Sequence, residues 1–144
     1  MKKIILFIFI GVSISGFSQK KLSKLLKQHN TEQIPYISVS ALQNEKDNVI
    51  LLDSREEKEY KTSHLENAIC VGYDSFNFEY IQPKLQNKNA KIVVYCSLGI
   101  RSEDVAEKLK KAGYTNVYNL YGGIFEWKNN HLEVLNNQEK PTDS

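Results

Sequence analysis

Apolar residues gather in five short runs along the chain, and amphipathic segments follow most of them. Two runs, at 49–52 and 92–95, are four consecutive apolar residues, the pattern of strands buried on both faces of a parallel sheet. Weaker strand signals lie at 36–39, 68–72 and 117–121. Helical patterns lie at 41–46, where Ser40 is the expected N-cap, and at 56–60, 102–112 and 122–127. This alternation predicts an α/β fold, a doubly wound five-stranded parallel sheet with helices on both faces.

The two ends of the chain differ from its centre. Lys2 and Lys3 precede an apolar run at 4–12, and small residues follow at Gly16 and Ser18, which is the pattern of a secretory signal peptide. The run is too short to span a bilayer. We expect cleavage after Ser18 and export to a bacterial periplasm, with retention as an N-terminal anchor as the alternative.

The remaining chain divides into three parts. A leucine stripe predicts a helical extension over 19–34, one domain occupies 35–130, and 131–144 is a polar tail in which we expect 136–144 to fray. No internal repeat or second domain is evident.

Composition narrows the class of protein. The chain is 25% charged and 41% hydrophobic over 144 residues, which excludes disordered and fibrous classes. Removal of Lys2 and Lys3 leaves 17 basic residues against 17 acidic ones, and the two signs are interleaved. We therefore expect no nucleic-acid partner. After cleavage of the signal peptide, the chain is not expected to be an integral membrane protein. Two cysteines and three histidines lack metal-ligand spacing, so neither a metal nor a cofactor is predicted.

The segment from Cys96 to Arg101 carries the candidate chemistry. It joins the run at 92–95 to a helical pattern that begins near Ser102. If the loop curls over the first turn of that helix, the amides of 97–101 can converge on the sulfur or on the group it holds, and Gly99 gives the backbone freedom for the curl. The helix N-terminus and the Arg101 guanidinium both favour a thiolate, so Cys96 is the expected nucleophile. The alternative is a buried cysteine that only closes a strand.

The spacing of cysteine, four residues and arginine resembles the active-site loop of single-domain rhodaneses. Phosphatases and arsenate reductases of the same fold have one residue more, so the six-member loop favours sulfur over an oxyanion. The resemblance extends over about 36–129 and implies a rhodanese domain. Its other signatures are Asp53, Arg55, Glu59, Tyr60 and His64, followed by Gly122, Gly123 and Trp127 near the end, where the double glycine is expected to pack beside the loop.

The resemblance assigns roles to these residues. Cys96 is the catalytic residue, and Asp53 and Arg55 support the site. The substrate-binding residues are Ser97, Leu98, Gly99, Ile100, Arg101 and Ser102. The spacing of Arg55 and Glu59 predicts an ion pair on one helix face, and His64 is given a structural role.

The second cysteine, Cys70, lies inside the weak strand signal at 68–72. We expect a buried, inert thiol. In an exported protein, a disulfide with Cys96 is the alternative.

The predicted activity is a sulfurtransferase. Cys96 would take a sulfane sulfur from thiosulfate or a persulfide and pass it to a thiol, to cyanide or to a protein thiol. Leu98 and Ile100 make the loop apolar, so we expect weak affinity for thiosulfate. An arsenate reductase or phosphatase, and a persulfide carrier or protein-binding module without turnover, are the alternatives.

Overall fold

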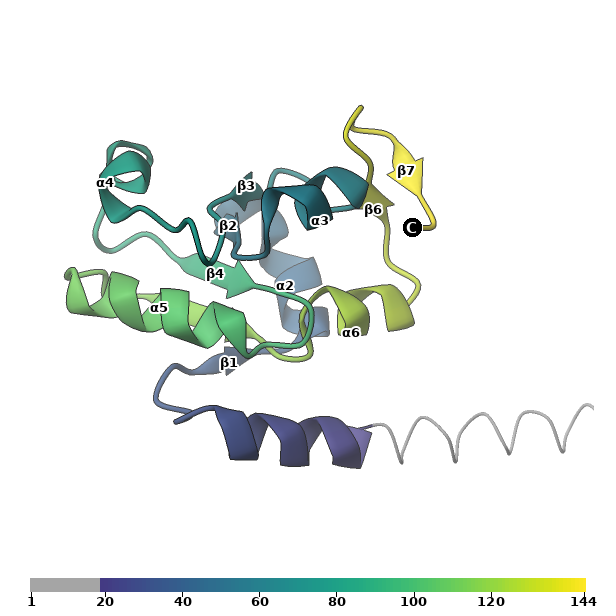
Figure 1. The fold of residues 1–144 in the computed structure, drawn as a ribbon, viewed down its shortest axis with the longest axis horizontal. Coiled ribbons are helices and arrows are strands. Elements are labelled where there is room, and N and C mark those ends of the chain that lie inside the picture. The colour runs from purple at the N-terminus through teal and green to yellow at the C-terminus, as the bar shows by residue number, and fades with distance from the viewer. Residues whose placement is uncertain (1–18) are drawn as a thin grey trace, which may run out of the picture. The chain divides into compact units, whose positions relative to one another are not determined.

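Five parallel strands form the predicted sheet, in the order β1-β5-β4-β2-β3 (Figure 1). The computed structural model describes residues 19–144, so the predicted signal peptide lies outside the described residues. The strands are β1 (Tyr36–Ile37), β2 (Ile50–Asp53), β3 (Ile69–Cys70), β4 (Ile92–Tyr95) and β5 (Val117–Leu120). The prediction of a five-stranded parallel sheet is confirmed, and β4 lies at its centre.

Helices cover both faces of this sheet. They are α2 (Val39–Glu45), α3 (Glu57–Thr62), α4 (Phe78–Ile81), α5 (Arg101–Lys111) and α6 (Gly123–Asn129), with 3-10 turns at η1 (Lys46–Asn48) and η2 (Gln82–Lys84). Successive side chains of β4 belong alternately to two hydrophobic cores. Val94 packs with Val105 and Leu109 of α5. Val93 packs with Ile124 and Trp127 of α6 and with Leu42 of α2. All four residues of β4 are therefore buried, which explains its continuous apolar run.

The chain divides into two units, residues 1–31 and residues 32–144. In the first unit, residues 19–29 are helical, as the leucine stripe predicts. Within residues 19–144, no helix is both long and apolar enough to cross a membrane.

The start of α2 differs from the prediction. Ser38, not Ser40, is the N-cap, and its Oγ accepts a hydrogen bond of 3.1 Å from the Ala41 amide. The helix therefore begins at Val39, which cuts the predicted strand 36–39 to two residues. Both serines precede an apolar residue, so sequence position alone does not separate them.

The C-terminal segment is not a frayed tail. Strands β6 (Val134–Leu135) and β7 (Pro141–Thr142) pair antiparallel, and Val134 and Leu135 are buried. Leu135 also exchanges two backbone hydrogen bonds with His64, of 2.8 and 2.9 Å. The predicted polar tail 131–144 therefore folds back onto the domain, through contacts between residues far apart in the sequence.

Candidate active site

The loop that follows β4 curls around the sulfur of Cys96. Cys96 is only 2% exposed, and the Gly99 amide donates a hydrogen bond of 3.2 Å to its Sγ. Gly99 has a φ of 120°, a backbone conformation that residues with a Cβ rarely adopt. The curl predicted from the sequence is therefore present, with its glycine where the chain turns.

The other predicted binding residues differ in their burial and in whether they contact this sulfur. Ser102 is buried, and its Oγ lies 3.3 Å from Cys96 Sγ. Leu98 and Ile100 are half-buried, so the exposed surface of the loop includes parts of two apolar side chains. Ser97 is also half-buried, and its Oγ accepts a hydrogen bond of 3.0 Å from Arg101 Nη2.

Arg101 fastens the loop to α3. Its Nη1 and Nη2 donate to the two carboxylate oxygens of Glu59 at 2.8 and 3.0 Å. Glu59 also accepts a bond of 2.9 Å from the Glu56 amide, in the capping box that starts α3. The hydrogen bonds from Arg101 lower the pKa of Glu59 to about 2, and those bonds raise the pKa of Arg101. The guanidinium thus lies in a bidentate pair that compensates its charge.

The predicted ion pair between Arg55 and Glu59 is wrong. Arg55 instead binds Asp53, with Nε to Oδ1 at 3.0 Å and Nη2 to Oδ2 at 2.7 Å. Helix α3 begins only at Glu57, so Arg55 precedes it and shares no helix face with Glu59. The pair of Asp53 and Arg55 is buried, and the bonds to Asp53 raise the pKa of Arg55 despite its burial.

Asp53 and Arg55 act on the Cys96 sulfur indirectly, through the residues that lie beside it. Asp53 is paired in register with Tyr95, the residue before Cys96, and the Arg55 guanidinium lies 5.8 Å from the centre of the Tyr95 ring. Arg55 Nη2 also donates to the Ser63 carbonyl at 2.6 Å, at the end of α3. The pair therefore supports the strand end that carries the loop.

His64 occupies a buried position between α3 and the C-terminal segment. Its Nδ1 lies 2.9 Å from the Tyr60 carbonyl and its Nε2 lies 2.9 Å from Glu139 Oε1. The imidazole also stacks on the Tyr60 ring, with centroids 3.9 Å apart. These contacts agree with a structural role.

The double glycine before α6 brings this helix against the loop. Ile124 and Phe125 donate their amides to the carbonyls of Cys96 and Ser97, at 2.9 and 3.2 Å. Gly123 has a φ of 57°, and a Cβ on it would lie 2.3 Å from the Cys96 carbonyl oxygen. The predicted packing of this motif beside the loop is confirmed.

Two contributors to the site were not singled out for their roles by the sequence. For Glu59, the sequence predicts Arg55 as the partner, whereas the structure pairs it with Arg101. Asn119, fully buried in β5, accepts from Ser102 Oγ at 2.6 Å and donates to the Gly99 carbonyl at 2.9 Å. A usable signal existed, because Asn119 is the one polar residue in an otherwise apolar and aromatic strand signal at 117–121.

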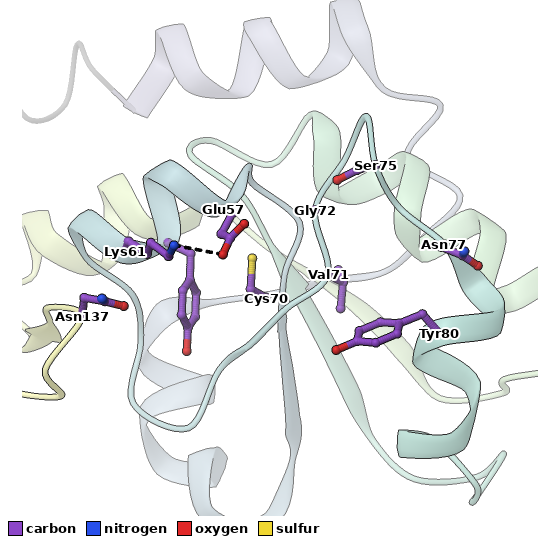
Figure 2. Close-up of a pocket in the computed structure, with 10 residues that line it drawn as sticks. Glu57, Lys61, Cys70, Val71, Gly72, Ser75, Asn77, Tyr80 and Asn137 are labelled. Carbon is purple, nitrogen blue, oxygen red and sulfur yellow. Dashed lines mark ion pairs between the residues drawn. The ribbon is translucent and has the colours of Figure 1, made fainter.

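Cys70 lies in a different pocket, shown in Figure 2. The pocket has a volume of about 600 Å³ and lies between α3 and the segment that leads to α4. Cys70 is partly exposed rather than buried, and desolvation raises the pKa of its thiol. Both cysteines are free, and the nearby Lys61 and Glu57 form an ion pair of 3.1 Å. The structure therefore holds no disulfide between Cys70 and Cys96.

Both the sequence and the fold of this chain have counterparts among known proteins. Residues 38–130 match the family model of the rhodanese-like domain. The chain belongs to the rhodanese-like domain family. Among solved structures, it is similar to a rhodanese-related protein from Thermoplasma volcanium, with a TM-score of 0.60, 25% identity, and coverage of 70% of this chain and 97% of that chain.

Two further comparisons concern longer proteins. A thiosulfate sulfurtransferase from Pseudomonas aeruginosa has a TM-score of 0.67 at 19% identity, over 78% of this chain and 22% of that chain, which shows a shared fold. A tRNA uridine(34) hydroxylase of Photorhabdus laumondii is 33% identical over 120 residues, which is 81% of this chain and 32% of that protein. The chain spans 23–36% of the length of the curated relatives with this name.

Proposed function

We propose that this protein is a sulfurtransferase that carries a sulfane sulfur as a persulfide on Cys96. The observation that carries the proposal is the buried sulfur in a six-member loop, with the Gly99 amide donating to it at 3.2 Å. A backbone donor fixed before the reaction stabilises negative charge on sulfur without rearrangement.

The reaction has two steps on one sulfur atom. The Cys96 thiolate attacks the outer sulfur of the donor, the S–S bond of the donor breaks, and the leaving group departs with the electron pair, as sulfite when the donor is thiosulfate. A thiolate or cyanide then attacks the outer sulfur of the Cys96 persulfide, forming a new persulfide or thiocyanate and restoring the thiolate. The kinetics are therefore ping-pong.

The choice of donor follows from the charges at the loop. Arg101 is paired with Glu59 through both of its terminal nitrogens, so little of its charge is left to attract a dianion. Leu98 and Ile100 add apolar surface beside it. We therefore expect a weak affinity for thiosulfate and favour a persulfide or polysulfide as the donor.

The relatives named tRNA uridine(34) hydroxylase do not make tRNA hydroxylation a stronger candidate function than sulfur transfer. The chain corresponds to only 23–36% of their length. Its 19 basic residues are nearly balanced by 17 acidic ones, whereas RNA phosphates require a basic surface.

The proposed place of action is the bacterial periplasm, reached by cleavage of the leader at residues 1–18. Its support is the sequence pattern alone, with two lysines, an apolar run and small residues. Cell fractionation with N-terminal sequencing tests it: a product that begins at Gln19 is expected, and an intact Met1 in the membrane fraction contradicts cleavage.

The test of the activity compares Cys96→Ser with Cys70→Ser in sulfur transfer from thiosulfate to cyanide. The first variant is expected to lose turnover and the second to keep it. Intact mass measurement of the wild type after incubation with thiosulfate should show one added sulfur atom on Cys96. Unchanged turnover in Cys96→Ser would refute the mechanism, while a persulfide without turnover would identify a carrier. Phosphate release from an aryl phosphate would favour a phosphatase.

A further inference from the structure

The sulfur of Cys96 is the end of a buried chain of hydrogen-bonding groups. Ser102 Oγ lies 3.3 Å from Cys96 Sγ, and it lies 2.6 Å from Asn119 Oδ1. Asn119 Nδ2 in turn donates to the Gly99 carbonyl at 2.9 Å. Ser102 and Asn119 are both 0% exposed, so bulk solvent does not reach either side chain and each depends on partners within the protein.

The chemistry of the partners fixes the direction of each hydrogen bond. A backbone carbonyl only accepts, so Asn119 must turn its NH2 group toward Gly99 and its carbonyl oxygen toward Ser102. That oxygen also only accepts, so Ser102 must donate its single hydroxyl hydrogen to Asn119. Ser102 therefore presents a lone pair, not a hydrogen, to Cys96 Sγ.

This direction affects the two anionic states of Cys96 differently. In the free thiolate the charge lies on Sγ, which faces the Ser102 lone pair at 3.3 Å. In the persulfide the charge lies mainly on the outer sulfur, one bond further out, and Sγ is close to neutral. For the hydroxyl to donate to a thiolate, it must leave Asn119, and a buried amide oxygen without its donor is costly.

We propose that Asn119 is a positioning residue that keeps the Ser102 hydrogen away from Cys96 and so favours the persulfide over the free thiolate. The part that concerns the persulfide rests on the proposed function. The part that concerns the free thiol does not, and it can be tested by alkylation alone.

The experiment measures the rate of alkylation by iodoacetamide across pH, in a Cys70→Ser background in which Cys96 is the only thiol. In Asn119→Ala, the Ser102 hydroxyl is free to donate to the thiolate. We expect alkylation at neutral pH to accelerate about tenfold, since hydrogen bonds to charged groups are the stronger ones, and its pH profile to move to lower pH. An unchanged rate and profile would overturn the inference.

A double-mutant comparison separates this effect from a loosened loop. In a Ser102→Ala background no hydroxyl is present, so Asn119→Ala should leave the alkylation rate unchanged. If the acceleration persists there, Asn119 acts through the Gly99 carbonyl alone and the inference is wrong. Thermal unfolding of each variant shows whether it is folded.

The isosteric variant Asn119→Asp provides a test should Asn119→Ala not fold. An aspartate still accepts the Ser102 hydrogen, so alkylation should not accelerate, and acceleration would contradict the inference. Mass measurement of the persulfide after thiosulfate is the separate test of the proposed function. If the wild type forms no persulfide, the proposed function is refuted. The alkylation result does not depend on persulfide formation and still tests the role of Asn119.

Discussion

Arg101 and Glu59 bind each other through two parallel hydrogen bonds, 42 residues apart in the sequence. The pair joins the end of the Cys96 loop to α3, which follows β2. A lysine cannot reproduce the two-pronged geometry of a guanidinium. We therefore expect Arg101→Lys to lower kcat/KM for sulfur transfer by about tenfold or more. Lys61→Met, which removes a cation from the exposed side of α3, is the matched control and should retain activity; equal activities would argue against this role of the pair.

The same pair gives a defined pH dependence of stability. The pKa of Glu59 falls from 4.5 to about 2 in the folded protein, because Arg101 binds the carboxylate. The contribution of the ionised Glu59 to the free energy of unfolding is therefore complete above about pH 4.5, and it is lost as the pH falls toward 2. Urea unfolding of the wild type and of Glu59→Gln should differ near neutral pH, and the difference should shrink across this window. A difference that stays constant down to pH 2 would show that Glu59 is not the titrating group.

Gly123→Ala tests the contact between α6 and the loop. The added Cβ would lie 2.3 Å from the Cys96 carbonyl, so the backbone must move. Gly113 is the matched control, since its φ of 101° is also positive but an added Cβ meets only Lys88 Nζ, at 3.9 Å. Both variants incur about 1–2 kcal/mol of backbone strain, measurable by urea unfolding. Only Gly123→Ala should also lose most of its sulfur-transfer activity, and full activity would contradict the contact.

The buried pair of Asp53 and Arg55 should contribute mainly to the stability of the fold and not to the sulfur-transfer reaction. Removal of one partner leaves a buried charge uncompensated, so Asp53→Asn should lower the free energy of unfolding by about 3–5 kcal/mol. Glu57→Gln breaks a pair whose side chains are 54% and 74% exposed, and such pairs contribute about 0–1 kcal/mol. Similar unfolding midpoints for the two variants would refute the distinction.

The sheet and the loop were predictable because their signals are local. Four apolar residues at 92–95 can be read without any partner, and so can the charges of α5, with Glu103 and Asp104 in its first turn and lysines in its last. The closing double glycine and the nucleophile were found in the same way. Each of these signals depends on neighbours within a few residues.

The features that were missed depend on distant partners. Glu59 could pair with either of two arginines, and only the start of α3 after Arg55 decides between them. Leu135 lies in a polar context, and the backbone of His64, 71 residues earlier, holds it. The direction of the Asn119 amide likewise depends on the carbonyl of Gly99, which no pattern of residue types reveals.

The contact of α6 with the loop has a consequence for the polarity of the site. In a trans peptide the carbonyl and the following amide point in opposite directions. Because the carbonyls of Cys96 and Ser97 point to the amides of α6, the N–H groups of Ser97 and Leu98 point away from that helix. The contact with α6 thus fixes the direction of these two amides in the Cys96 loop. Variation in the segment after β5 can therefore change the direction of these amides while every residue of the loop stays the same.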